Sequence, residues 1–192
     1  MSEADPHEWL NGWWRHATHI PSPNFDARPP SVPIDLLVVH SISLPPGEYG
    51  GRDIQALFTN QLDATRHPYF LSIAHLKVSS HFVILRDGRC EQYVSVLDRA
   101  WHAGVSHWHG RERCNDFSVG IELEGLEHET FDQAQYETLC QLSLSLCGLL
   151  PIQSVAGHEH VAPDRKSDPG RAFEWPRLKL ALQHIPLHWP GA

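Results

Sequence analysis

The sequence predicts an α/β fold in which a mixed central β-sheet is flanked by helices. Short apolar runs at 34–40, 119–124 and 154–157 are typical of buried strands. An Asp-Gly pair between two further strand-like runs indicates an antiparallel hairpin. A long segment with helical periodicity separates the last two apolar runs. Helices that alternate with strands around such a hairpin are best accommodated by a mixed sheet.

The chain length favours one domain, because 192 residues suit a single substantial hydrophobic core. We therefore expect one domain over 1–192, without internal repeats or low-complexity linkers. Residues 1–33 are rich in Trp and Pro, which predicts an irregular N-terminal arm that wraps over the core.

The first half of the chain after the arm contains three candidate strands. Residues 34–40 form a β-branched apolar run, which predicts a fully buried strand. Residues 53–62 place apolar side chains on one helical face, whereas 66–78 fit no single pattern. Runs at 79–85 and 90–94 flank the Asp-Gly turn and predict the two strands of the hairpin.

The second half begins with a strand that has two different faces. Over 119–124, apolar side chains at every second position share one face, while Glu122 and Glu124 share the other. A further short strand is predicted at 154–157.

Two helices follow from capping and proline signals. Thr130 is expected to open a long helix, with Gln133 completing a capping box and Pro151 ending it. Pro176 suits the first position of a last helix that runs to about His184.

Charge and hydropathy exclude several classes of partner. The net charge is −8, from 15 basic and 23 acidic residues, which argues against nucleic acid or an anionic membrane surface. No segment is long and apolar enough to span a bilayer. The acidic start of the chain lacks the basic and apolar regions of a secretory signal, so we expect a cytoplasmic protein.

The four cysteines form no metal-binding or redox pattern. None belongs to a CxxC pair, and a chain of this size needs no disulfides. Cys140 and Cys147 lie one heptad apart in the predicted long helix, which indicates packing. Free thiols in a reducing compartment are the simplest expectation. Cys114 as a hydrolase nucleophile is a weaker alternative.

The loop from Gly157 to Gly170 carries the residues with the most distinctive chemistry. It places histidine, lysine and aspartate close together between prolines. Imidazole and carboxylate can hold zinc, and a nearby lysine can stabilise an oxyanion. His40, at the end of the apolar run 34–40, is the candidate for a third ligand. Two histidines, one aspartate and an open fourth position would make a catalytic zinc site.

The residues alone leave the choice of metal ligands open. A lone strand-end histidine such as His40 is more often a hydrogen-bonded structural residue than a ligand. His160 competes with His158, because residues two apart on a strand share a face. Asp164 competes with Asp168 on the same loop.

The other candidate residues also have ordinary structural interpretations. Glu124 competes with Glu122 on the same strand face, and paired strand carboxylates are often a solvated edge. A single tryptophan such as Trp101 belongs to a core more often than to a sugar-stacking site. Lys77 and Arg113 would usually form surface ion pairs of little energetic weight.

Nine segments together carry a resemblance that covers the chain from about residue 15 to about residue 180. The sequence resembles the zinc-dependent N-acetylmuramoyl-L-alanine amidases, which share a fold with peptidoglycan recognition proteins. Within them it is most similar to the amidases that act on 1,6-anhydro-muramyl peptides in cell-wall recycling. The matching segments are Pro21–Pro29, Leu37–His40, Ile42–Gly47, Ala74–Leu76, Arg99–Ser106, Gly110–Ser118, Gly120–Gly125, Ala162–Lys166 and Asp168–Gly170.

The resemblance implies roles for particular residues and resolves the alternatives above. One zinc ion per chain would be held by His40, His158 and Asp168. Glu122 would act as general base, and Lys166 would stabilise the transition state. The bond cut would be the amide between the lactyl group of muramic acid and L-alanine of the stem peptide.

The same resemblance implies a small muropeptide as the ligand. Trp101 would stack on the sugar, and Lys77 and Arg113 would bind carboxylates of the stem peptide. The chain departs from the family pattern at Ser41, where asparagine is usual, so a substrate contact there is altered. Lys77 replaces a frequent arginine and keeps the charge without the bidentate fork.

Two other functions fit the same resemblance. A non-catalytic muropeptide-binding module would commonly lack a zinc ligand, but all three ligands are present here together with Glu122 and Lys166. A lytic amidase that degrades intact wall is the second alternative. We expect the recycling enzyme, acting as a monomer.

Overall fold

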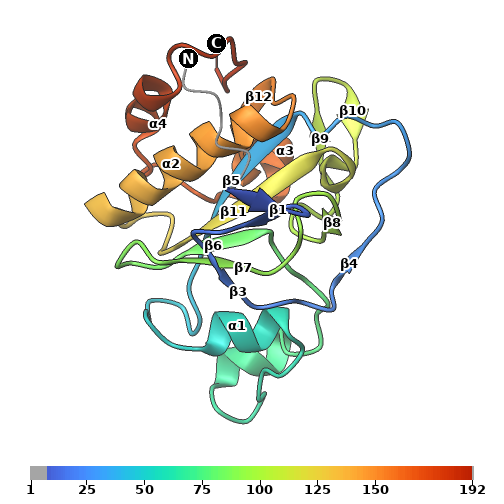
Figure 1. The fold of residues 1–192 in the computed structure, drawn as a ribbon. Coiled ribbons are helices and arrows are strands. Elements are labelled where there is room, and N and C mark those ends of the chain that lie inside the picture. Colours follow the sequence, from blue (N-terminus) through green and yellow to red (C-terminus); the bar gives the residue numbers. More distant parts are fainter. Residues whose placement is uncertain (1–7, 192) are drawn as a thin grey trace.

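In a computed structural model, which describes residues 8–191, the chain is organised around a six-stranded mixed β-sheet (Figure 1). The sheet order is β12-β5-β11-β6-β7-β3. Strands β12, β5, β11 and β6 run parallel, β6 and β7 are antiparallel, and β3 is parallel to β7. The mixed sheet flanked by helices confirms the predicted fold class. The strands are β3 (Thr18–His19), β5 (Leu36–Ile42), β6 (Phe82–Ile84), β7 (Cys90–Gln92), β11 (Ser118–Glu124) and β12 (Ser154–Gly157).

The strand β5 differs from the prediction at both ends. Most of the run 34–40 forms a buried strand, but β5 begins at Leu36 and continues to Ile42, so His40 lies inside the strand and not at its end. The strand continues because Ser41 and Ile42 still pair with residues of β11. In this register His40 lies directly beside Glu122.

One face of the sheet is covered by α2 (Gln133–Leu149) and α4 (Trp175–Ala181), as Figure 1 shows. The apolar side chains of β11 predicted to share a face lie in this core, together with Leu139, Leu142 and Leu146 of α2. Each such fully buried leucine contributes about 2 kcal/mol of hydrophobic stabilisation. The opposite face of β5 carries Leu36, Val38 and then His40, so the polar site faces away from α2 and α4.

The start of α2 corrects the predicted capping box. The helix begins at Gln133, its N-cap is Asp132, and the N–H of Asp132 donates to Oε1 of Gln135 at 3.0 Å. Thr130 lies before the helix because its neighbour Phe131 is buried in the core. The sequence offers the same spacing twice, and burial of Phe131 selects the second.

The other helical segments are shorter than the predicted ones. The helix α1 covers Asp53–Phe58 and ends where Asn60 adopts a positive φ of 60°. The ambiguous stretch 66–78 contains the 3-10 helix η1 (Pro68–Ser72). Pro176 lies in the first turn of α4, but the helix begins one residue earlier than predicted, at Trp175, and ends at Ala181. The Asp-Gly hairpin between β6 and β7 is confirmed.

The N-terminal arm is irregular apart from short strand pairs. Two strands, β1 (Trp9–Leu10) and β2 (Trp13–Trp14), pair with each other, and β4 (Phe25–Asp26) pairs with β8 (Arg99–Ala100). Trp14 is fully buried against the core. The first seven residues of the predicted arm lie outside the described residues.

The remaining elements surround the face of the sheet that carries His40. They are β9 (His107–Trp108), β10 (Arg111–Glu112), η2 (Cys114–Asp116), α3 (His158–Val161) and η3 (Pro163–Arg165). Among residues 8–191, no helix has the length and apolar character needed to cross a membrane.

The cysteines give a first testable prediction. All four are free in the structure, and burial raises the pKa of each thiol, to about 11 for Cys147. A thiol reagent at pH 8 should therefore react slowly with the native protein and rapidly with four thiols after denaturation. A disulfide in protein purified from its natural host would contradict this prediction.

Candidate active site

Three side chains from distant parts of the chain converge on the face of the sheet opposite α2 and α4, beside β5. Nδ1 of His40 lies 3.0 Å from Nδ1 of His158 and 3.1 Å from Oδ2 of Asp168. Nδ1 of His158 lies 3.1 Å from the same carboxylate oxygen. All three residues are buried. These are the ligands expected from the sequence, and the three atoms form a compact triangle.

This triangle fits a metal ion. Within the described residues, His40, His158 and Asp168 are the group whose ligand atoms lie within 4.8 Å of one another. Ligand atoms of a tetrahedral site with bonds of about 2.0 Å are about 3.3 Å apart, close to the observed spacing. Two imidazole nitrogens and one carboxylate oxygen are a donor set typical of catalytic zinc. The residues therefore fit a divalent metal with an open position.

The loop after β12 explains why His158 is selected over His160. Both lie on the single helical turn α3, not on a strand, so they point in different directions. Nδ1 of His160 accepts the N–H of Gly157 at 3.0 Å, and its ring stacks edge-on against Trp175. The assumption that residues 158 and 160 share a strand face was wrong, because the strand ends at Gly157.

Asp164 and Asp168, the two candidate aspartate ligands, differ in burial. Asp164 lies in η3 and is exposed, whereas Asp168 is buried and its carboxylate faces both histidines. The carbonyl of Asp168 also accepts the N–H of Glu159 at 2.8 Å, which ties the loop back to α3. Asp168, and not Asp164, therefore belongs to the metal-binding triangle.

Glu122 and Glu124, the two candidates for the general base, differ in the groups that their carboxylates contact. Oε1 of Glu122 lies 4.0 Å from Nδ1 of His40, beside the triangle. Glu124 is further along β11 and accepts backbone N–H groups from Gly50 at 2.6 Å and Arg86 at 3.1 Å. Glu122 is therefore the carboxylate next to the candidate metal site, and Glu124 is engaged in loop structure.

Burial and neighbouring groups shift the pKa values of His40 and Asp168 in the triangle. Burial, followed by the neighbouring His158, lowers the pKa of His40 to about 4, which favours the neutral, metal-binding imidazole. Burial opposes ionisation of Asp168, but the two histidines beside its carboxylate outweigh that effect and hold its pKa below the usual range. At His40 the site therefore presents a neutral nitrogen donor, and at Asp168 an anionic oxygen donor.

The electrostatics of Glu122 differ from those of Asp168. Burial, followed by repulsion from Asp168, raises the pKa of Glu122 well above the usual range. A carboxylate with a raised pKa is a stronger proton acceptor than an exposed one. Two neighbouring carboxylates with opposite shifts are typical of an acid–base centre.

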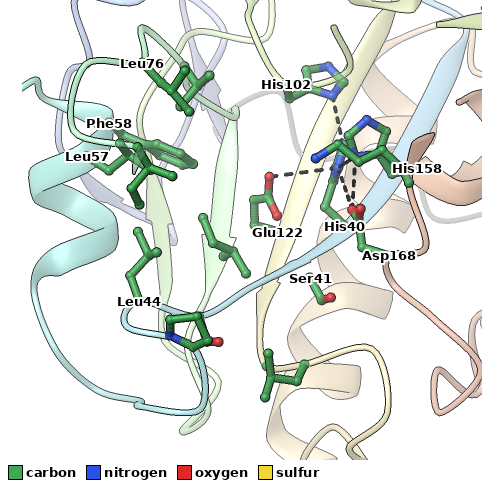
Figure 2. A pocket seen from close by; sticks show the side chains of 18 of the residues that line it. His40, Ser41, Leu44, Leu57, Phe58, Leu76, His102, Glu122, His158 and Asp168 are labelled. Atoms are coloured by element: carbon green, nitrogen blue, oxygen red, sulfur yellow. Dashed lines mark hydrogen bonds and ion pairs between the residues drawn. The ribbon is translucent and has the colours of Figure 1, made fainter. Parts of the chain in front are cut away.

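A cavity of about 350 Å³ opens over this group. Figure 2 shows its two contrasting sides, with His40, Glu122, His158 and Asp168 facing an apolar wall. The wall comes from α1, from the segment around η1 and from the loop after β5. Its residues include Leu44, Leu57, Phe58, Tyr69, Ile73, Leu76 and Val78.

The structure brings most, but not all, of the predicted site residues to this cavity. Ser41, Trp101 and Lys166 line it together with the metal-binding triangle and Glu122. Within the described chain, Lys77 and Arg113 are exposed and lie outside its lining. Nε of Arg113 instead pairs with Asp116 at 3.3 Å.

Sequence reasoning missed two features of the cavity. The apolar wall was not expected, because nothing in the sequence pattern places the segments of α1 and η1 beside the metal-binding triangle. His102 also lines the cavity and contacts His40. It lies in one of the segments that carried the family resemblance, next to Trp101, but nothing in the sequence pattern assigned it a partner.

Comparison with known proteins assigns this arrangement to a family. Residues 30–171 match the family model described as N-acetylmuramoyl-L-alanine amidase (Amidase_2). The 1,6-anhydro-N-acetylmuramyl-L-alanine amidase AmpD of Salmonella typhimurium strain SL1344 is 53% identical over 173 residues, covering 89% of this chain and 92% of that protein.

Solved structures of similar proteins support the same comparison. The crystal structure of a selenomethionine AmpD derivative superposes with a TM-score of 0.87 at 50% identity, covering 90% of this chain and 97% of that one. The Escherichia coli amidase AmiD, in complex with anhydro-N-acetylmuramic acid-L-Ala-D-gamma-Glu-L-Lys, gives a TM-score of 0.58 at 29% identity, covering 79% and 59%. Drosophila peptidoglycan recognition protein SD, at 17% identity and a TM-score of 0.55 over 88% and 89%, shares the fold. The chain belongs to the N-acetylmuramoyl-L-alanine amidase family.

Proposed function

We propose that the protein hydrolyses the amide between the lactyl group of 1,6-anhydro-N-acetylmuramic acid and L-alanine, in peptidoglycan recycling. The observation that carries this proposal is the convergence of His40, His158 and Asp168 beside the buried Glu122. The 53% identity to an AmpD amidase supports the same substrate class.

Zinc is the metal proposed for the site. Bound there, it would polarise the scissile carbonyl and lower the pKa of a water molecule to about 7. Glu122 would take a proton from that water and pass it to the leaving amine of L-alanine. Lys166, exposed at the cavity rim, would place its ammonium group near the developing oxyanion.

The cavity suggests how the substrate would lie. Ser41 and Trp101 line it near the polar side, where a muramic acid ring would meet the scissile amide. Nε1 of Trp101 donates to Asp26 at 3.2 Å, which fixes the indole ring at the cavity edge. A serine at position 41 offers a shorter polar group than asparagine, so a contact there would need a closer ligand or a bridging water.

Two alternatives are less well supported. A non-catalytic binding module needs no complete metal triangle with an adjacent buried carboxylate, and both are present here. A lytic amidase acting on intact wall is the second candidate. We also propose that the protein is a monomer and that it is cytoplasmic, the latter because four free thiols fit a reducing compartment.

One experiment tests the proposed function and its alternatives together. The zinc-loaded protein would be incubated with anhydro-muramyl-tripeptide and, separately, with intact sacculi, and the products identified by mass spectrometry. We expect free tripeptide and anhydro-N-acetylmuramic acid from the first and little release from the second. Binding without cleavage would indicate the recognition module, and efficient release from sacculi would indicate the lytic enzyme.

A second prediction concerns binding of the stem peptide. We propose that Lys77, which follows the cavity residue Leu76, and Arg113 bind its carboxylates. Because such a contact is shared by ground and transition states, Arg113→Ala should raise KM about tenfold with little change in kcat.

Steady-state kinetics on the tripeptide substrate would measure this change. Arg89→Ala is the matched control, because its side chain is 70% exposed against 69% for Arg113 and lies on the hairpin turn. Equal KM values for the wild type and Arg113→Ala would refute the assignment.

A further inference from the structure

The side of each histidine ligand that faces away from the metal-binding triangle is also hydrogen-bonded. Nε2 of His40 lies 2.9 Å from Nδ1 of His102. Nε2 of His158 lies 3.2 Å from the carbonyl oxygen of Ala103. The two partners are consecutive residues, so one short segment after β8 contacts both histidine ligands.

These contacts fix which nitrogen of each ring carries the proton. A carbonyl oxygen only accepts, so Nε2 of His158 must donate to Ala103 and Nδ1 is left with its lone pair. Nδ1 of His40 needs a lone pair to bind a metal, so Nε2 of His40 must donate to His102. Nδ1 of His102 then accepts and its own proton lies on Nε2, which faces Oγ of Ser118 at 3.1 Å.

The segment that carries these partners is itself held firmly. Oδ1 of Asn115 accepts the N–H groups of His102 at 3.3 Å and Ala103 at 2.8 Å. Arg165 donates to the carbonyl of Ala103 at 2.7 Å. Gly120 makes room for the ring, because a Cβ there would lie 2.5 Å from His102. The imidazole of His102 therefore packs between Gly120, on the strand that carries Glu122, and the ring of His40.

We propose that His102 is a positioning residue for the metal site. Its Nδ1 accepts a hydrogen bond from Nε2–H of His40 and so keeps Nδ1 of His40 unprotonated and directed at Asp168 and His158. The carbonyl of Ala103 performs the same task for His158. Hydrogen-bond partners of this kind typically raise metal affinity about 10- to 100-fold by orienting the ligand ring and fixing its tautomer. The inference rests on the proposed metal binding.

The test is the affinity for zinc alone, measured by competition with a chromophoric chelator. His102→Leu removes the acceptor at similar size and should weaken zinc binding about 10- to 100-fold. His102→Asn places Oδ1 near the position of Nδ1, and should recover most of that affinity. His184→Leu, at an exposed position after α4, is the control and should bind zinc like the wild type.

Thermal unfolding of the metal-free variants would separate a folding defect from a positioning effect. Nitrogen-15 spectra of the imidazoles in the wild-type zinc complex add a measurement that needs no variant. They should show His102 protonated at Nε2 and bare at Nδ1.

Equal zinc affinity in His102→Leu and the wild type, no recovery in a folded His102→Asn, or a proton on Nδ1 of His102 would each overturn the inference while leaving the proposed function intact. A wild-type protein that binds no zinc would overturn both.

Discussion

Replacing Glu122 by glutamine is expected to lower kcat for the muropeptide amide by about 100- to 10,000-fold while zinc stays bound. Glutamine keeps the shape of the side chain on β11 but cannot accept a proton. Glu122 is buried, lies 4.0 Å from Nδ1 of His40, and has a pKa raised by burial and by Asp168, all of which suit a general base. Single-turnover kinetics with metal analysis of the same sample would measure both quantities.

Glu124→Gln is the matched control, two residues along the same strand face. Glu124 is equally buried, but its carboxylate accepts N–H groups of Gly50 and Arg86. Glutamine retains one acceptor oxygen and loses the other, so the replacement should lower stability by about 1–3 kcal/mol with kcat nearly unchanged. An inactive Glu124→Gln beside a fully active Glu122→Gln would show that the base had been assigned to the wrong carboxylate.

The elements with strong periodicity were predictable from the sequence alone. The alternation of β11, the hairpin at Asp87-Gly88 and the long apolar stripe of α2 all appear where the pattern placed them. The ends of elements were less predictable, because tertiary burial decides them. Burial of Phe131 moves the start of α2 past Thr130, and continued pairing with β11 extends β5 beyond His40.

The metal-binding triangle and Glu122 were predictable from the sequence, but the rest of the cavity and its geometry were not. Local patterns could not choose between His158 and His160, because the assumed strand is a helical turn and that turn alone separates their directions. The family resemblance made the choice, and the structure gives its physical reason. The apolar wall and the contact of His102 with His40 depend on chain segments far apart in sequence, which periodicity does not report.

The register between β5 and β11 is the link between fold and chemistry. Because the strands are parallel and pair His40 with Glu122, a ligand and the candidate base lie side by side on the face opposite α2. A shift of one residue would turn Glu122 into the core and bring Leu123 to the site. The apolar core formed by Val119, Ile121 and Leu123 therefore fixes the position of the candidate general base Glu122 as well as stabilising the sheet.

Metal binding gives the last and most decisive expectation. The wild-type protein should bind one zinc ion per chain, and His158→Ala should weaken that binding more than about 100-fold, the upper range for loss of an outer-shell partner. His158 would supply one of the three proposed ligand atoms, and the remaining two should not hold zinc against a competing chelator. Added zinc should raise the melting temperature of the wild type but not of His158→Ala, because a ligand stabilises only the state that binds it.

His160→Ala is the control for this experiment, since it removes an imidazole two residues away. Nδ1 of His160 accepts the N–H of Gly157 and its ring packs on Trp175, so its loss should affect stability and leave the three ligand atoms in place. Metal analysis after dialysis against a chelator would compare the two variants. Zinc retained by His158→Ala and lost by His160→Ala would show that His160, and not His158, is the metal ligand. It would also contradict the inference that only the first residue of α3 faces the metal site.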